Sequence, residues 1–236
     1  MLGLEAQLGA AKTPKYAVSE SGDTLELIER PHGGVSAVLV DGQRSGRAAR
    51  IISNIVARKA ISLLGEGVRD GAAARAAHDY LRTHRSGQVS AELQMVSVDL
   101  VTHTLVISRN TYCPTWVVRE GQLERLEGGN GPIGIHANTK PTITELPLAA
   151  QLYVVLVTDG LLTAGTRIGV PLDLDRLVLE GALAQLPAQA LADSLLDAAL
   201  AADRGRPLDD CTVLVLAVLP RQEAVEVRRY SVSIAI

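Results

Sequence analysis

The chain has 236 residues, the length of one domain or of one domain with an appendage. Its hydrophobic fraction of 47% is enough for a full core, but Phe is absent and only 3% of the residues are aromatic, so aliphatic side chains must fill the interior. A net charge of -3 gives no electrostatic reason to expect nucleic acid or an acidic membrane as a partner.

No segment of the sequence suits a membrane span or an export signal. The longest unbroken apolar run extends only from Val213 to Leu219, which is far too short to cross a bilayer. The chain does not open with a basic stretch followed by an apolar one. Its two cysteines, Cys113 and Cys211, are too few and too far apart for a disulfide framework or a zinc site. Together these features predict a soluble cytoplasmic protein.

The first part of the chain predicts strands followed by two helices. Residues 1–14 are small and mixed, and we expect them to form a loosely held lead-in. Residues 15–23 and 33–42 have the pattern of two β segments, the second of which ends in Asp41-Gly42. Apolar residues follow helical spacing from 46 to 64, and an Ala-rich second helix is predicted for 68–85.

The rest of the chain returns to strands, then helices, then strands. Residues that favour β structure are frequent from 89 to 116, and the segments 91–100, 102–110 and 115–126 resemble a meander. A loop is predicted at 127–136 and more strand at 143–157. Two helices (174–186 and 188–203), a core strand (211–219) and an added strand or hairpin in the tail (224–236) complete the prediction. This grouping favours an α+β sandwich of sheets with helices outside over alternating β-α-β units.

Aspartates stand at strand ends or in tight turns at four places. Asp23, Asp41 and Asp159 each neighbour a glycine, which permits a sharp turn and a close approach of the backbone to a ligand. Asp209 and Asp210 lie just before the last core strand. Each place taken alone is explained by a turn, because Asp-Gly after a strand is a common turn signal.

The aspartates are more informative as a set. If the strands that carry them are neighbours, the strand ends bring several carboxylates together. Clustered carboxylates repel one another and cannot all stay ionised unless a cation compensates their charge. Oxygen ligands without a His or Cys partner select Mg²⁺ or Mn²⁺ rather than zinc. The set therefore predicts a site for one of these two ions.

Five short motifs stand at or near these aspartates and in the loop between them. They are Ser21-Gly22-Asp23; Asp41-Gly42 with Ser45-Gly46 and Ala49 opening a helix; Gly131 to Ile135; Thr158-Asp159-Gly160; and Asp209-Asp210-Cys211-Thr212. In kind and order they resemble the motifs of the metal-dependent protein phosphatases of the PPM type, in particular their SpoIIE-like branch, and they cover about residues 15–219, the predicted phosphatase domain. The segments around Asp41 and Asp159 are most similar to the RsbX-type stand-alone phosphatases of stress-signalling complexes.

The resemblance implies a fold and a set of metal ligands. The fold would be two stacked antiparallel β-sheets flanked by two pairs of helices. Asp41 would bridge two ions, Mn²⁺ or Mg²⁺, and the carbonyl of Gly42 would bind one of them. Asp159 would be a ligand delivered by a rigid strand, Asp209 would hold the other ion, and Asp23 would act directly or through a water. Asp41, Asp159 and Asp209 would then form the catalytic centre.

Of the residues next to the predicted ligands, Arg44 and Asp210 each keep two interpretations. Gln43 stands where animal relatives often have His, and it cannot act as an acid at neutral pH. Arg44 is either a contact for the substrate phosphate or a solvated arginine at the helix start. Asp210 is either an outer group of the metal centre or a residue that caps the turn. The segment 128–134 lacks the Lys-Ser/Thr pair of a P-loop, so a turn is favoured there.

The resemblance implies a serine/threonine phosphatase that hydrolyses phosphoserine or phosphothreonine on a signalling protein, through water activated by two metal ions. The RsbX-like segments imply that this partner is a STAS-domain stress-signalling protein. The competing hypothesis is a catalytically weak binding module with a phosphatase fold, which the altered segment from Gln43 to Ser45 keeps open. The presence of all the predicted metal aspartates argues against it. Neither nucleic acid nor a membrane is expected as a partner.

Overall fold

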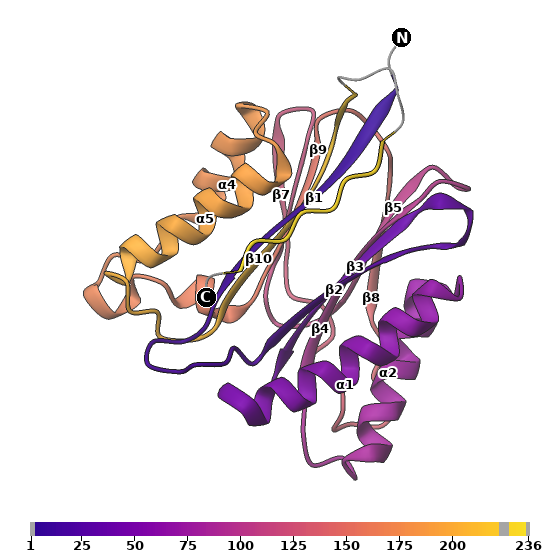
Figure 1. Cartoon of the computed structure of the whole chain (residues 1–236), viewed down its shortest axis with the longest axis vertical. Helices are drawn as coiled ribbons and strands as arrows, with labels where there is room; N and C mark the ends of the chain where they lie inside the picture. The colour runs from indigo at the N-terminus through magenta and orange to yellow at the C-terminus, as the bar shows by residue number, and fades with distance from the viewer. Residues whose placement is uncertain (1–2, 222–226, 235–236) are drawn as a thin grey trace.

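Two antiparallel sheets of five strands each stack face to face in the computed structural model, which describes residues 3–221 and 227–234 (Figure 1). Sheet A contains, in spatial order, β1 (Leu4–Thr13), β10 (Cys211–Pro220), β9 (Leu152–Val157), β6 (Thr115–Arg119) and β7 (Gln122–Leu126). Sheet B contains β2 (Asp23–Glu29), β3 (Val35–Gly42), β4 (Ala91–Asp99), β5 (Thr104–Asn110) and β8 (Thr142–Pro147). The predicted α+β sandwich is confirmed.

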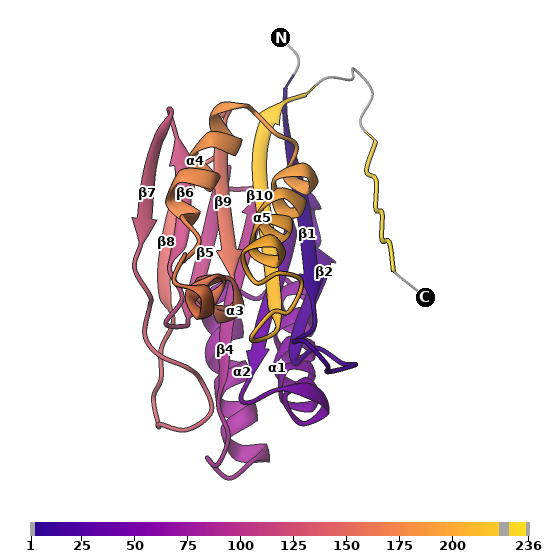
Figure 2. The same cartoon turned by 90° about the vertical axis from the view of Figure 1, so that its left-hand side faces the viewer.

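A pair of helices covers the outer face of each sheet (Figures 1 and 2). Sheet B carries α1 (Gly46–Gly65) and α2 (Asp70–His84), and sheet A carries α4 (Leu174–Leu183) and α5 (Ala188–Ala202). Short connecting helices are η1 (Pro31–Gly33), α3 (Asp159–Thr163) and η2 (Thr166–Ile168). In the described ranges, no helix combines the length and the apolar character needed to cross a bilayer.

The core forms three apolar layers, and strand β9 shows how the sequence produces them. Successive side chains of a strand point to opposite faces, so a strand covered on both faces is apolar throughout. Tyr153, Val155 and Val157 pack under α4 and α5, whereas Leu152, Val154 and Leu156 pack between the sheets. All six side chains are buried, and this double burial explains the uninterrupted apolar run before Asp159.

The N-terminal residues form a strand, so the prediction of a loosely held lead-in is wrong. Strand β1 pairs with β10 along its whole length, from Leu4 opposite Pro220 to Thr13 opposite Cys211. Its β character is weak in the sequence because the strand packs tightly under α5: a Cβ on Gly9 would clash with the backbone of Gln189. The predicted strand at 15–23 is also wrong, because residues 14–22 form turns and bends and β2 begins at Asp23.

The predicted meander is divided between the two sheets. Strands β4 and β5 belong to sheet B, but β6 and β7 belong to sheet A. The predicted strand region 143–157 is likewise split, with β8 in sheet B and β9 in sheet A. Each sheet has one face in the common interior, so the apolar pattern of a strand does not tell to which sheet it belongs.

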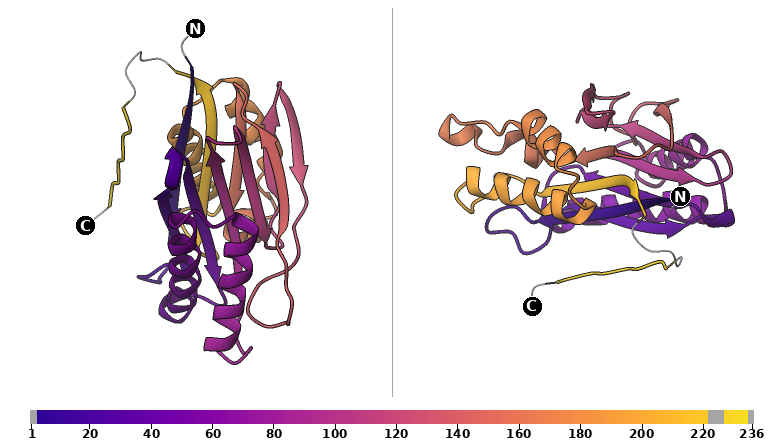
Figure 3. Two further views of the ribbon diagram at one scale, coloured as in Figure 1. Left: turned by 90° about the vertical axis from the view of Figure 1, so that its right-hand side faces the viewer. Right: turned by 90° about the horizontal axis from the view of Figure 1, so that it is seen from above.

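The tail does not form the predicted strand or hairpin in the residues that the structure describes. Residues 227–234 contain no strand or helix and run outside the sandwich on the side of β1 and β2 (Figures 2 and 3). The guanidinium of Arg228 donates to the carbonyl oxygen of Gly33 at 2.9 Å and pairs with Glu29 at 2.8 Å. The predicted segment also includes 224–226 and 235–236, which lie outside the described residues.

Candidate metal centre

The predicted aspartates meet at one edge of the sandwich. At this edge β2 begins and β3 ends in sheet B, and β9 ends and β10 begins in sheet A. Asp23 and Asp41 lie directly opposite each other in the β2–β3 ladder. A pocket of about 300 Å³ opens there, and its lining includes Lys15, Asp41, Arg44, Glu92, Asp159 and Asp209.

Asp23 is buried and is held from the opposite sheet. Its Oδ2 accepts hydrogen bonds from the hydroxyls of Thr158, at 3.0 Å, and Thr212, at 2.5 Å. Its Oδ1 is buried without a hydrogen-bond partner. Burial raises the pKa of this carboxyl to about 7, against the opposing effect of the two hydroxyl donors. One oxygen is therefore fixed and the other is free to take a cation.

Asp41 carries the most perturbed carboxyl of the group. Burial raises its pKa to about 9, and the negative charges of Asp23, Asp159 and Glu92 add to the effect. Burial, with the repulsion between clustered carboxylates added to it, therefore favours the protonated form of this side chain when no cation is bound. The next residue, Gly42, is needed for packing, because a Cβ there would clash with the carbonyl oxygen of Ala49 in α1.

Asp159 begins the short helix α3 and opens onto the pocket. The residue is exposed at the pocket opening, but loss of water on its protein side, together with the charges of Asp209 and Glu92, raises the pKa of its carboxyl to about 6. A Cβ on Gly160 would clash with the carbonyl oxygen of Asp210, so glycine is needed where the two segments cross. Asp209 is half-buried, and its Oδ1 accepts a hydrogen bond from the backbone N–H of Asp210 at 2.9 Å.

Asp210 turns away from the pocket and clamps the connection between β1 and β2. Its Oδ1 accepts from the N–H of Lys15 and its Oδ2 from the N–H of Gly22, both at 2.9 Å. Both carboxylate oxygens of Asp210 thus accept hydrogen bonds from the backbone of the β1–β2 connection. The geometry supports a structural role next to the centre, the second of the two interpretations that the sequence leaves open.

Gln43 and Arg44 line the opening of the pocket, directly before α1. The backbone N–H of Gln43 donates to the carbonyl of Ser90 at 3.1 Å, and its side-chain Oε1 accepts from the N–H of Ser90 at 3.2 Å. Arg44 has a left-handed backbone, with φ of 76°, and its side chain is exposed. The turn that these residues form therefore holds a positive charge at the opening of an acidic pocket.

Two charged residues of the pocket lining, Glu92 and Lys15, were not among the predicted ones. Glu92 lies opposite Asp41 in the β3–β4 ladder, and Lys15 lies in the connection clamped by Asp210. A single acidic residue at the start of a predicted strand was the only signal for Glu92. Its place beside Asp41 depends on strand register, which one sequence does not reveal.

The donors fit a hard divalent ion by their chemistry, although their side chains stand apart. In the described residues, no three His, Cys, Asp or Glu side chains converge closely enough to hold one ion. The buried Oδ1 of Asp23 has no partner, and the neighbouring carboxyls of Asp41 and Asp159 have raised pKa values. Carboxylate oxygens alone suit Mg²⁺ or Mn²⁺, and an ion would draw these groups together.

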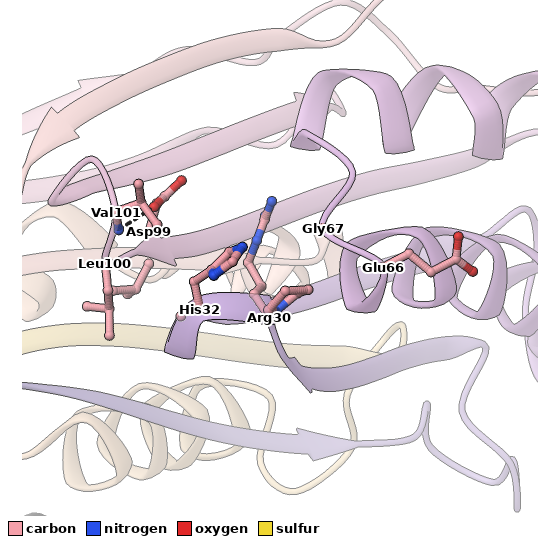
Figure 4. Close-up of a pocket in the computed structure, with 10 residues that line it drawn as sticks. Arg30, His32, Glu66, Gly67, Asp99, Leu100 and Val101 are labelled. Carbon is pink, nitrogen blue, oxygen red and sulfur yellow. Dashed lines mark hydrogen bonds between the residues drawn. The ribbon is translucent and has the colours of Figure 1, made fainter.

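A second pocket lies at the opposite end of β2 and has a different character (Figure 4). It measures about 220 Å³, and Arg30, His32, Glu66 and Asp99 are among its lining residues. The guanidinium of Arg30 is already paired with the buried Asp70 at 2.8 Å. None of the predicted site residues lies there, so the acidic pocket remains the candidate centre.

Solved structures define the class to which this fold belongs. The chain matches a structure of the PP2C phosphatase domain and a fragment of the regulatory domain of SpoIIE from Bacillus subtilis with a TM-score of 0.78 and 20% identity, over 94% of this chain and 66% of that one. The catalytic domain of the serine/threonine phosphatase PstP, solved with two manganese ions, gives a TM-score of 0.68 and 18% identity over 92% and 100%. A structure concerned with the bacterial stressosome gives 0.67 and 18% over 90% and 99%. The fold is that of the PP2C-type phosphatases.

The sequence narrows this class to one family. Residues 31–219 match the family described as Stage II sporulation protein E (SpoIIE), and the chain belongs to that family. Stage II sporulation protein E of Bacillus subtilis (strain 168) is 22% identical over 210 residues, which are 89% of this chain and 25% of that protein. The chain thus spans about a quarter of the length of this curated relative. The predicted resemblance to the SpoIIE-like branch is confirmed.

Proposed function

We propose that the chain is a Mn²⁺- or Mg²⁺-dependent phosphatase that hydrolyses phosphoserine or phosphothreonine on a protein. The observation that carries the proposal is the buried, unpartnered Oδ1 of Asp23. Asp23 lies directly across the ladder from Asp41, and Asp41 lines a pocket together with Asp159 and Asp209. Several carboxyls with raised pKa values in one place are an arrangement that a divalent cation stabilises. Membership of the SpoIIE family supports the same chemistry.

The roles of the residues follow from their places in the pocket. Asp41 lies between Asp23 and the remaining carboxyls and is the residue suited to bridge two ions, with the Gly42 carbonyl beside it. Asp159 and Asp209, from the strand ends of sheet A, would complete the ligand set. Bound divalent ions would neutralise the phosphate oxygens and lower the pKa of water to about 7.

The residues that line the pocket opening would bind the substrate rather than the ions. Arg44 and Lys15 line the opening and carry positive charge, so either can contact the phosphate dianion. Gln43 is tied to Ser90 and cannot protonate the leaving alkoxide at neutral pH. We therefore expect a modest turnover number.

The proposed substrate is a phosphorylated STAS-domain protein in a cytoplasmic stress-signalling system, as for RsbX-type phosphatases. Support comes from the similarity of the Asp41 and Asp159 segments to that group and from the fold shared with the stressosome-related structure. The alternative is a weak phosphatase-fold module that binds such a partner without turnover. The modified Gln43–Ser45 turn is the feature that favours this alternative.

Release of phosphate from a small aryl phosphate, with and without metal, tests the proposal. We expect activity with Mn²⁺, weaker activity with Mg²⁺, and none after chelation. Metal content is measured on the same samples. Full activity in excess EDTA, in protein that retains no metal, would contradict the two-metal chemistry. Absence of turnover under every metal condition would favour the binding module.

A further inference from the structure

Three carboxylates stand in a row across three neighbouring strands. Asp41 in β3 lies opposite Asp23 in β2 on one side and opposite Glu92 in β4 on the other. Directly opposed side chains in antiparallel strands have Cβ atoms only about 5 Å apart, so like charges there destabilise the sheet. The predicted ligand set accounts for Asp23 and Asp41 but leaves Glu92 without a role.

The side chain of Glu92 is oriented rather than free. The hydroxyl of Thr111 donates to Oε2 of Glu92, and this hydroxyl in turn accepts a hydrogen bond from the N–H of Cys113 at 2.9 Å. Thr111 is fully buried, so the donor is fixed in position. One carboxylate oxygen of Glu92 is thereby held at the pocket wall, as Oδ2 of Asp23 is held by Thr158 and Thr212.

No salt bridge neutralises this row in the described residues, although Lys12 donates to the backbone carbonyl oxygen of Asp23 at 3.0 Å and its charge favours the ionised carboxylate there. Among the residues that the structure describes, no Lys, Arg or His forms a salt bridge with Asp23, Asp41 or Glu92. Asp23 is 1% exposed and its Oδ1 has no partner, so an unsatisfied oxygen lies inside the row itself. An unpaired buried acceptor in a row of carboxyls without a salt bridge indicates that the missing partner is a cation.

We propose that Glu92 is a further acidic ligand of the metal centre, contributed by β4 and oriented by Thr111, and that it binds a divalent cation on the β4 side of Asp41. The proposal rests on the proposed function, because it concerns the same pocket. It extends the ligand set from the strand ends of β2, β3, β9 and β10 to a third strand of sheet B. Thr111 acts through Glu92 and is a positioning residue.

Calorimetric titration of Mn²⁺ into the metal-free protein tests the proposal without relying on catalysis. Glu92→Gln should weaken binding by more than about tenfold or remove one ion from the stoichiometry, because a charged ligand is lost. Thr111→Val should weaken binding about tenfold, the effect of losing a group that orients a ligand. Thr111→Ser keeps the hydroxyl and should bind like the parent. Glu124→Gln, which removes one exposed negative charge on β7, is the matched control and should also bind like the parent.

The melting temperature of the metal-free variants provides a second readout. Near pH 9, where Asp41 ionises, Glu92→Gln should melt at a higher temperature than the parent, because one charge that repels Asp41 is gone, whereas Glu124→Gln should not. Parent-like titration of Glu92→Gln, alongside lost binding in Asp41→Asn, overturns the role of Glu92 and leaves the metal centre intact. Parent-like titration of both variants overturns the centre itself, and with it the proposed function.

Discussion

The hydroxyl of Thr212 donates a hydrogen bond to Oδ2 of Asp23 at 2.5 Å, from one sheet of the sandwich to the other. Thr212 belongs to β10 in sheet A, and Asp23 begins β2 in sheet B. Thr158, the residue directly after β9, adds a second donor to the same oxygen. The stacking of the two sheets therefore determines which oxygen of Asp23 stays available to a cation.

Replacing Thr212 with Val should weaken the metal site while leaving the fold in place. We expect the Mn²⁺ concentration for half-maximal activity to rise about tenfold, because Asp23 loses a group that orients it. Thr212→Ser retains the hydroxyl and should behave like the parent. Circular dichroism establishes that the variants are folded, and unchanged Mn²⁺ dependence of Thr212→Val would show that the bond serves only to join the sheets.

Replacing Asp159 with Asn should remove most turnover without unfolding the protein. The substitution removes one charge from the proposed ligand set, and in the metal-free protein it also relieves repulsion with Asp209 and Glu92. We therefore expect the metal-free variant to be at least as stable as the metal-free parent in chemical denaturation. The exposed Asp197→Asn serves as the control. A parent-like kcat at saturating Mn²⁺ would show that Asp159 is only a turn residue and not a metal ligand.

The stability of the metal-free protein should fall as the pH rises. The folded-state pKa values of Asp159, Asp23 and Asp41 are raised to about 6, 7 and 9 from an ordinary value of 3.8. The native state therefore binds more protons than the unfolded state between pH 4 and 9, and its advantage is lost as the pH passes each folded-state value. We expect the melting temperature to decrease from pH 5 to pH 9.

Added Mn²⁺ provides the control for this pH dependence. A bound cation replaces the protons on the carboxylates, so the stabilisation by Mn²⁺ should grow with pH. The Asp41→Asn variant lacks the most perturbed group and should show a flatter profile without metal. A melting temperature that is constant, or that rises, across this pH range in the metal-free parent would contradict the raised pKa values.

An intact phosphorylated STAS-type partner should be hydrolysed with a much higher kcat/KM than a short phosphopeptide copied from it. The phosphate site lies in an open pocket at a sheet edge, so selectivity must come from contacts between two folded surfaces. Binding energy from those remote contacts would orient the ester at the metals. Both substrates are compared at one Mn²⁺ concentration. Equal values would leave a generic phosphatase and remove the reason to propose a stress-signalling substrate.

The sequence predicts the main elements of the fold because burial on both faces leaves a strong signal. The apolar run of β9 and the helical spacing of α1 can be recognised in the sequence without knowing which segments they pack against. Strand β1 cannot be recognised in this way, because it needs small residues such as Gly9 where it packs against α5, which lies far along the chain. The sequence also does not predict which strand belongs to which sheet, because strands of both sheets face the same buried interior.

The candidate site shows the same limit. Asp41 and Asp159 are visible in the sequence because a charge directly follows an apolar run. Glu92 becomes part of the site only through its register opposite Asp41, and the hydroxyls of Thr158 and Thr212 reach Asp23 only through the stacking of the sheets. Strand register and contacts between the sheets belong to the tertiary structure, and the local sequence pattern does not reveal them.

The position of β10 has a consequence for how the protein is made. This strand lies between β1 and β9 in sheet A, although β1 precedes it by most of the chain. A nascent chain therefore cannot close sheet A until Pro220 has left the ribosome, and such long-range pairing is intrinsically slow. Asp209 and Thr212 emerge with this last strand. We expect a nascent chain whose β10 has not yet emerged to hold β1 unpaired and to lack a complete metal centre, so that catalysis begins only after β10 has paired.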